Sequence, residues 1–328
     1  MLSTIAFFIN RAVVQGIPLL FGSTGEIITE KSGHLNLGIP GIMYVGAVSG
    51  VIGAFFYEKN AGGDLNPFLA VLIPLLSSLL GSLVMSMIYG FLTITLRANQ
   101  NVTGLALTTF GIGFGNFFGG SLATLYGEGG ALSLKATSDI FKVTLPFTGK
   151  LGSIGTIFLS YGFMAYLAII IAVVAAFILK HTRVGLNLRA IGESPATADA
   201  AGINVTRYKY GAVSLGGMIA GLGGLYFIMD YSCGIWSNGG FGDRGWLAIA
   251  LVIFAIWNPD IGILGSILFG GLYVVNVLMP NLGTRSQQLV KMLPYVVTLL
   301  VLIVTSLRKK RETQPPMSLG LSYFREDR

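Results

Sequence analysis

Residues Lys180 to Tyr210 read KHTRVGLNLRAIGESPATADAAGINVTRYKY and form the longest hydrophilic stretch with helix signals in a strongly apolar chain. A short helix at its centre has both ends marked. Ser194 is a suitable N-cap, and Pro195 follows at the first helical position, where a missing N–H does no harm. Ala196 to Ala201 are mostly strong helix formers, and Gly202 stands where a left-handed C-cap residue is expected. The stretch therefore predicts a helix of roughly two turns.

Such a short helix is marginal by itself in water and needs something to pack against. Its exposed face would be rich in alanine and therefore slim. We consider two interpretations. In the first, the helix protrudes and inserts into a pocket on another protein. In the second, it is an ordinary loop helix between two membrane spans. The local sequence favours neither.

The composition of the rest of the chain is that of a membrane protein. Of its 328 residues, 53% are hydrophobic and only 11% are charged, and its mean hydropathy is +0.74. A soluble domain carries about 25% charged residues, so the main solvent of this chain is lipid. We expect an all-α, polytopic membrane protein. The formal charge of +7 is not a nucleic-acid footprint, because the positive residues gather at loop ends beside apolar runs.

Apolar runs predict eight to ten transmembrane helices. A polar break, Ser23 to His34, separates the first two runs, and Gly245 to Trp257 is short for a full span. The runs are Ile5–Gly22, Leu35–Phe56, Phe68–Leu96, Val102–Leu122, Ile154–Leu179, Gly211–Met229, Gly245–Trp257, Ile261–Met279 and Leu289–Leu307.

The positive residues predict the orientation. Residues 180–210 and the basic run that opens the C-terminal segment, Arg308 to Arg311, should both be cytoplasmic. The transmembrane part is then residues 1–310, and residues 311–328 form a cytoplasmic tail that we expect to be loose. Simple counting of the runs places the N-terminus outside.

Glycines spaced four residues apart predict close helix packing. Helix sliding during opening and closing is the alternative interpretation. The glycines in question are Gly46 and Gly50, Gly111, Gly115 and Gly119, and Gly217 and Gly221.

The sequence shows no residues arranged for catalysis. His34, His181 and Cys233 lack the spacing of metal ligands, so no metal site is predicted. A Gly-x-x-x-x-Gly-Lys-Ser/Thr phosphate loop is also missing. The chain is therefore predicted not to be an enzyme. If it performs active transport, the energy must come from an ion gradient or from a partner.

An ion-coupled carrier is one alternative, because acidic residues within spans are typical of such carriers. The candidates are Glu26, Glu30, Asp230 and Asp243, all near the ends of spans or at breaks. Structural pairing or helix capping is the simpler explanation for each. An integral-membrane enzyme is a third possibility, which the missing catalytic arrangement disfavours.

Four stretches, in this order, resemble the nucleoside-type permeases of bacterial ABC importers, within the larger branched-chain amino acid and ribose permease group. They are GEIITEKSGHLNLGIPGIMYVGA (Gly25–Ala47), LRANQNVTGLAL (Leu96–Leu107), TRVGLNLRAIGESPATADAAGI (Thr182–Ile203) and GDRGWLAIALVIFAIWNP (Gly242–Pro259). By its length and short N-terminus the chain is similar to the shorter of the two permeases that such importers use. One departure is Pro40, where many relatives carry a glutamate, and it puts the specificity inferred from the family in doubt.

The resemblance implies an importer in the bacterial cytoplasmic membrane, with two permeases, two cytoplasmic ATPases and an external binding lipoprotein or protein. The chain itself would carry no cofactor, and ATP with magnesium would be bound by the partner ATPase. Residues 195–201 would be the coupling helix, seated in a groove of that ATPase. The coupling residues would be Glu193, Ser194, Pro195, Ala196, Asp199, Ala200, Ala201 and Gly202.

The resemblance also implies a pathway for a nucleoside, which needs polar edges and stacking faces. Each candidate could instead have a structural role. The candidates are Glu30, Asn36, Asn99, Phe110, Phe114, Asn116, Asp243 and Trp246. A sugar or a branched-chain amino acid is the alternative substrate for the same machinery.

Overall fold

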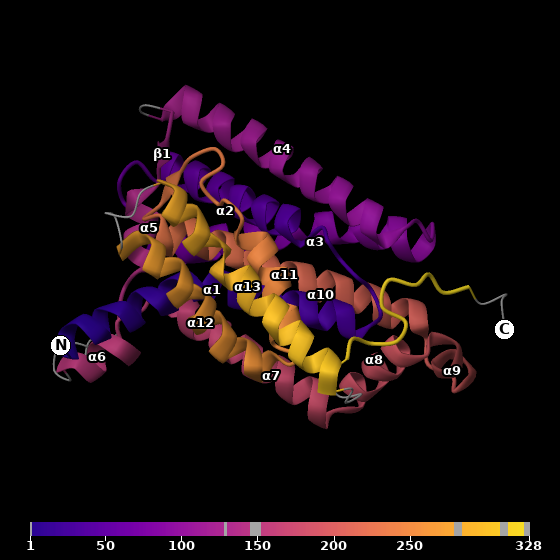
Figure 1. The fold of residues 1–328 in the computed structure, drawn as a ribbon. Helices are drawn as coiled ribbons and strands as arrows, with labels where there is room; N and C mark the ends of the chain where they lie inside the picture. Colours follow the sequence, from indigo (N-terminus) through magenta and orange to yellow (C-terminus); the bar gives the residue numbers. More distant parts are fainter. Residues whose placement is uncertain (1, 128–129, 145–151, 279–283, 309–313, 325–328) are drawn as a thin grey trace.

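A computed structural model describes residues 2–127, 130–144, 152–278, 284–308 and 314–324. Most of them belong to helices, and the longer helices run between the two ends of one bundle (Figure 1). The helices are α1 (Leu2–Lys31), α2 (Ile39–Ala61), α3 (Pro67–Gly90), α4 (Gln100–Tyr126), α5 (Lys135–Phe141), α6 (Gly152–Phe158), α7 (Phe163–His181), α8 (Arg183–Glu193), α9 (Pro195–Ala200), α10 (Val205–Tyr226), α11 (Arg244–Phe254), α12 (Pro259–Leu278) and α13 (Thr284–Arg308). Two π-helical segments, η1 (Phe91–Thr95) and η3 (Phe227–Tyr231), extend α3 and α10. The two-residue strands β1 (Leu132–Ser133) and β2 (Ile235–Trp236) pair antiparallel.

The predicted all-α, polytopic architecture is confirmed. Within the described residues, seven helices are long and apolar enough to cross a membrane. Two apolar stretches are shorter: α11, whose 11 residues span only about 16 Å, about half of a bilayer core, and the part of α12 from Pro259 to Val275. The number of eight to ten crossings stays a prediction, since it depends on how these two helices are counted.

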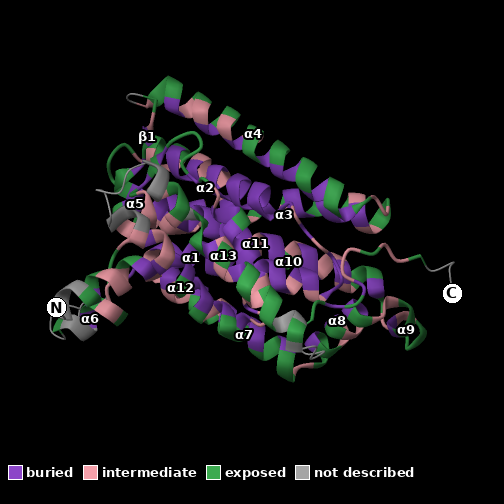
Figure 2. Cartoon of the chain, viewed as in Figure 1, coloured by how far each residue is buried: buried purple, intermediate pink, exposed green. Residues whose placement is uncertain are grey.

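The centre of the bundle is formed by α2 and α10, which Figure 2 shows as mostly buried. Glycine permits this packing. A Cβ added to Gly46 would lie 2.5 Å from the Cα of Gly221, and one added to Gly111 would lie 2.6 Å from the carbonyl oxygen of Gly41. Backbone atoms cannot move aside as side chains can. The packing interpretation of the glycine spacing is therefore confirmed at these positions.

The predicted break at Ser23 to His34 is wrong for most of its length, because α1 continues as a helix to Lys31. Long-range contacts explain the difference. The Glu26 carboxylate accepts a 2.9 Å hydrogen bond from the backbone N–H of Asn36. The Glu30 carboxylate accepts a hydrogen bond from the Trp257 indole. These polar side chains are buried inside the bundle, so the segment has no need to leave it.

The predicted single run Ile154–Leu179 is also wrong, because it is divided into α6 and α7. The turn between them packs against other elements. The Nδ2 atom of Asn10 donates a 2.6 Å hydrogen bond to the Ser160 hydroxyl. A Cβ added to Gly162 would lie 2.6 Å from the carbonyl oxygen of Phe141, so only glycine fits the turn there. Contacts with α1 and α5 thus fix a bend that the apolar run conceals.

The described part of the C-terminal segment, residues 314–324, is not the loose tail that we expected. Ser318 is buried, and its backbone N–H donates a 2.9 Å hydrogen bond to the carbonyl oxygen of Gly192. Gly320 N–H donates to the Gly33 carbonyl oxygen at 3.2 Å, and Gln100 Nε2 donates to the Leu321 carbonyl oxygen at 3.3 Å. Backbone hydrogen bonds therefore hold this segment, although its sequence is hydrophilic. The basic run at 309–311 lies outside the described residues.

Candidate functional site

The short helix expected between Lys180 and Tyr210 is present as α9, with the predicted ends. The Ser194 hydroxyl accepts a 3.4 Å hydrogen bond from the Thr197 N–H, and Pro195 occupies the first turn. Gly202 follows in the left-handed conformation, with φ of +83°. The local prediction from caps and helix formers is therefore confirmed.

Helix α9 is attached to the bundle by one face and is exposed on the other. Ala198 is 3% exposed and packs in an apolar cluster with Ile191 and Val205. The exposed residues are small or short around the helix, apart from one acid: Glu193, Ala196, Thr197, Ala200, Ala201 and Gly202. Figure 1 shows α8 and α9 at the end of the bundle opposite to α6 and the N-terminus. Helix α9 is therefore a narrow protrusion whose inner face is packed against the bundle.

At the other end, α4 borders a recess of about 490 Å³. Its wall consists of polar and aromatic side chains one turn apart on α4, together with a residue from the loop after β2. These lining residues are Asn116, Phe117, Gly120, Ser121, Thr124, Leu125 and Asn238.

Two amide side chains give the recess its chemistry. The Asn116 Oδ1 atom accepts a 2.5 Å hydrogen bond from the Tyr44 hydroxyl, and the Asn238 Oδ1 atom accepts a 3.3 Å hydrogen bond from the Trp236 indole. Within the described structure neither amide nitrogen donates to another residue, so both N–H₂ groups are available as donors. The exposed ring of Phe117 adds a flat apolar surface. Such a set can hold a flat molecule with acceptor atoms on its edge.

The structure brings three of the predicted pathway residues together, on α4. Phe110, Phe114 and Asn116 share this helix, and the rings of Phe110 and Phe114 lie 6.0 Å apart. Phe114 also lies 4.5 Å from the ring of Phe118. Aromatic rings therefore continue along α4 from the recess towards the middle of the helix.

The other predicted pathway residues lie apart from this row. Glu30 and Asn36 are buried at the far end of α1 and beyond it, and Asn99 is the N-cap of α4, accepting from the Val102 N–H at 3.1 Å. At the start of α11, Asp243 accepts a 3.3 Å hydrogen bond from the Tyr295 hydroxyl, and Trp246 is 37% exposed. These five residues form no common site with the α4 residues.

Sequence reasoning missed most of the recess. Gly120 and Thr124 continue the α4 face of Asn116 at helical spacing, so the period of the helix was a usable signal. Asn238 comes from a loop more than a hundred residues later, and no local pattern links it to α4. Pro40, the departure from the family pattern, lies elsewhere: a Cβ on Gly245 would come within 2.5 Å of its Cα, at the contact between α2 and α11.

Comparison with known proteins identifies the family of the chain. The family model described as "Branched-chain amino acid transport system / permease component" matches residues 8–302. The chain belongs to this permease family. The permease is 33% identical over 306 residues to the nucleoside ABC transporter permease protein NupC of Lactococcus lactis subsp. cremoris, covering 92% of each chain. It is a multi-pass membrane protein and a component of an ABC transport system that has other subunits.

Two further relatives cover nearly the whole permease. The guanosine ABC transporter permease protein NupQ of Bacillus subtilis is 30% identical over 303 residues, 91% of each chain. A protein of Haloferax volcanii, provisionally named a glucose ABC transporter permease, is 30% identical over 354 residues, 99% of each chain. No solved structure matches the permease.

Proposed function

We propose that this permease moves a nucleoside across the bacterial cytoplasmic membrane as the shorter of two permeases in an ATP-driven importer. The observation that carries the proposal is α9, a capped and slim helix that protrudes from one end of a permease bundle. The similarity to permeases that are named for nucleosides and for guanosine supports the substrate.

In this proposal α9 is the coupling helix. Its exposed small residues, Ala196, Ala200 and Ala201, let it enter a groove on a cytoplasmic ATPase, while buried Ala198 transmits the push to the bundle. The ATPase binds ATP with magnesium, and this chain has no ATPase site of its own. A push on one helix can move a gate only if the bundle has two conformations of similar energy.

The orientation follows from the position of α9. If α9 is cytoplasmic, the described C-terminal segment is cytoplasmic too, because Ser318 is hydrogen-bonded to Gly192 at the base of α9. The recess beside Asn116 then faces the outside, where an extracellular binding lipoprotein or protein would deliver the substrate. This arrangement supplies the substrate at one end of the chain and the energy at the other.

The recess and the aromatic row on α4 are the proposed start of the substrate pathway. Helix α4 is mostly exposed, although it carries the Asn116 amide, and an amide facing hydrocarbon is unfavourable. A second, longer permease would cover this face, so that the pathway runs between the two chains. The amide donors suit the carbonyl and ring-nitrogen acceptors of a nucleobase, and Phe117 suits its flat face.

A sugar is the second candidate substrate, because the similar Haloferax volcanii protein is provisionally named for glucose. Glucose offers hydroxyl groups to the same amides and the C–H face of its ring, instead of an aromatic face, to Phe117. The two candidates are therefore separated by which labelled substrate is taken up.

The test is uptake by the purified importer, with its binding protein and ATPase, in proteoliposomes. Guanosine, uridine, glucose and leucine are compared as labelled substrates. We expect ATP-dependent uptake of a nucleoside that falls strongly in Asn116→Leu and Phe117→Ala and is unaffected by collapsing ion gradients. Uptake of glucose alone would replace the nucleoside with a sugar. Uptake that needs an ion gradient and no ATPase would overturn the importer mechanism.

A further inference from the structure

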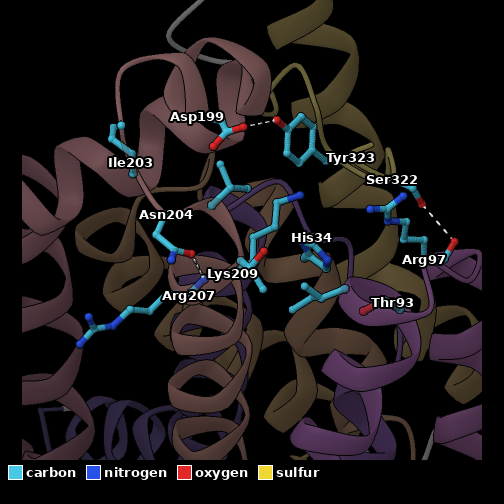
Figure 3. A pocket seen from close by; sticks show the side chains of 14 residues that line it. His34, Thr93, Arg97, Asp199, Ile203, Asn204, Arg207, Lys209, Ser322 and Tyr323 are labelled. Carbon is cyan, nitrogen blue, oxygen red and sulfur yellow. Dashed lines mark hydrogen bonds between the residues drawn. The ribbon is translucent and has the colours of Figure 1, made fainter. Parts of the chain in front are cut away.

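A second cavity, of about 690 Å³, lies at the α9 end of the permease, far from the recess on α4 (Figure 3). Four separate segments surround it: the loop after α1, the loop between η1 and α4, the α9–α10 connection and the C-terminal segment. Nothing in the proposed transport cycle uses this space. Its volume falls in the range of pockets that bind small metabolites, about 300–1,000 Å³.

A buried lysine marks the cavity as a site for an anion. Lys209 is only 3% exposed, and Figure 3 shows its side chain reaching in among the lining residues. Within the described residues, no carboxylate or other acceptor hydrogen-bonds its ammonium group, which lies 6.0 Å from the centroid of the Tyr323 ring. The Asp199 carboxylate, also in the wall, accepts a hydrogen bond from the Tyr323 hydroxyl at 2.8 Å. A buried ammonium group without a hydrogen-bond acceptor is costly, and an anionic ligand would relieve that cost.

The start of α10 adds to the positive character. Helix α10 has 22 residues, and Asn204 caps its first turn by accepting from the Arg207 N–H at 2.9 Å. The backbone from Asn204 onwards lines the cavity, so the N-terminal end of a long helix faces it. Helix N-termini attract phosphate and carboxylate groups through their free N–H groups and the helix dipole.

Arg97 supplies a second cation from the opposite wall. It has a φ of 57°, a conformation that non-glycine residues rarely adopt, and its guanidinium lies 4.7 Å from the ring of Phe324. Ser322 donates to the Arg97 carbonyl oxygen at 3.4 Å, which ties this strained residue to the C-terminal segment. Strained backbone of this kind is concentrated at binding sites.

A histidine forms the floor. His34 is 1% exposed, and neither of its ring nitrogens has a hydrogen-bond partner within the described structure. Buried polar atoms without partners are rare in native proteins. Burial and the nearby Lys209 ammonium lower the pKa of His34 to about 3, so the ring is neutral and offers one donor and one acceptor.

We propose that this cavity binds a small phosphorylated metabolite of the size of a nucleoside monophosphate, with its phosphate between Lys209, Arg97 and the start of α10. A phosphate group alone would leave most of the cavity empty, so the phosphate must be attached to a larger group that fills the remaining space. Tyr323 and His34 provide flat and polar surfaces for a base. The cytoplasmic origin of the ligand rests on the proposed orientation of the importer.

The position of the site gives it a consequence for transport. A bound ligand would contact the α9–α10 connection, the loop before α4 and the C-terminal segment together, and would resist movement of α9 relative to the bundle. A nucleoside taken into the cell becomes such a ligand when a ribose hydroxyl group loses its proton and accepts a phosphoryl group from a nucleoside triphosphate, which leaves as the diphosphate. The site would then slow import when the phosphorylated product accumulates.

The test is equilibrium binding to the purified importer complex in nanodiscs. The probe is uridine 5′-monophosphate, chosen because it lacks the adenine and the triphosphate of ATP. Uridine, inorganic phosphate and short-chain phosphatidylglycerol are the comparison ligands. The variants are Lys209→Gln and Thr206→Glu. The control is Lys135→Gln, which removes one positive charge from the exposed side of α5. Thr206→Glu adds an acid to the first turn of α10, which favours the helix while repelling an anion.

We expect the monophosphate to bind wild type and Lys135→Gln alike, and to bind Lys209→Gln and Thr206→Glu about tenfold more weakly or worse. Equal binding by all variants would overturn the site. Binding of uridine or inorganic phosphate as tight as that of the monophosphate would overturn the ligand class, and preference for phosphatidylglycerol would make it a lipid site. Binding is measured without transport, so a negative result leaves the proposed importer function standing.

Discussion

The hydroxyl group of Tyr323 donates a 2.8 Å hydrogen bond to the Oδ2 atom of Asp199. These residues are 124 positions apart in the chain, and the bond joins the C-terminal segment to α9. The same segment is held to Gly192, at the base of α9, through Ser318. The C-terminal segment therefore supports the helix that we propose to receive the push of the ATPase.

Removing this bond should loosen α9. In Tyr323→Phe we expect amide hydrogen exchange in residues 196–202 to be about fivefold faster, because a partly exposed hydrogen bond to a carboxylate contributes about 1 kcal/mol. Tyr57→Phe is the matched control, since the Tyr57 hydroxyl accepts a 2.9 Å hydrogen bond from the Asn66 N–H, far from α9 along the chain and in the fold. Unchanged exchange in Tyr323→Phe would mean that the segment does not stabilise α9.

The slim face of α9 should be needed for its partner. Ala200→Trp places a bulky ring on the exposed side of the helix. We expect the variant to insert in the membrane at normal levels, to lose co-purification of the ATPase and to show no uptake. Ala136→Trp, on the exposed side of α5 near the other end, is the control and should behave as wild type. Normal uptake by Ala200→Trp would exclude α9 as the coupling helix.

The orientation can be tested with the native cysteine. Cys233 is exposed and lies two residues before β2, whose partner strand β1 is at the end of the bundle opposite to α9 (Figure 1). We expect a membrane-impermeant maleimide to label intact cells through Cys233 and to fail in Cys233→Ser. In that background, Thr197→Cys on α9 should be labelled only after the cells are made permeable. The reverse pattern would invert the proposed topology.

The sequence was a good guide wherever the deciding residues are neighbours in the chain. The ends of α9 follow from Ser194, Pro195 and Gly202, and each acts within one turn. It was a poor guide where the deciding contact is distant. Glu26 and Glu30 look like the start of a loop, yet Asn36 and Trp257 satisfy them inside the bundle.

The recess illustrates the same limit. Asn116 lines the recess and could be selected from the sequence as a polar residue within an apolar run, whereas Phe110 and Phe114 lie on the same helix outside the recess. Asn238 completes the recess from a loop that long-range contacts bring near, among them the pairing of β1 with β2 and the hydrogen bond from the Gly239 N–H to the Tyr44 hydroxyl. The charge of Lys209 belongs to the pattern that predicts the cytoplasmic side, but its burial in a cavity is a property of the folded chain alone.

Two glycines on α4, Gly111 and Gly113, predict different effects of substitution by alanine. A Cβ at Gly111 would meet backbone atoms of Gly41 at 2.6–2.8 Å, whereas a Cβ at Gly113 would meet nothing within 4 Å. Gly111→Ala should therefore destabilise the protein by about 1–3 kcal/mol, through separation of α4 from α2. Gly113→Ala should be neutral or stabilising by up to about 1 kcal/mol, because alanine favours helix. Unfolding in detergent compares the two, and equal effects would contradict the packing interpretation.

The buried imidazole of His34 should make stability depend on pH. Its folded pKa, about 3, lies below its ordinary value near 6.5, so the folded state resists protonation. Above pH 6.5 the group has no effect. As the pH falls below 6.5, the unfolded chain takes up a proton that the folded chain does not, and stability is lost.

At pH 5 this loss amounts to about 2 kcal/mol. Lys209 is the charged group that acts on the His34 ring. Its ammonium group stays protonated in the unfolded chain between about pH 5 and pH 7.5, so it does not contribute to the change. His34→Gln should remove the loss, so that the variant is less sensitive than wild type to a change from pH 7.5 to pH 5 in detergent unfolding. His181→Gln, at the exposed end of α7, is the control and should retain the wild-type sensitivity. An equal fall in stability for wild type and His34→Gln would show that the ring takes up its proton in the folded state, and the floor of the cavity would then be charged.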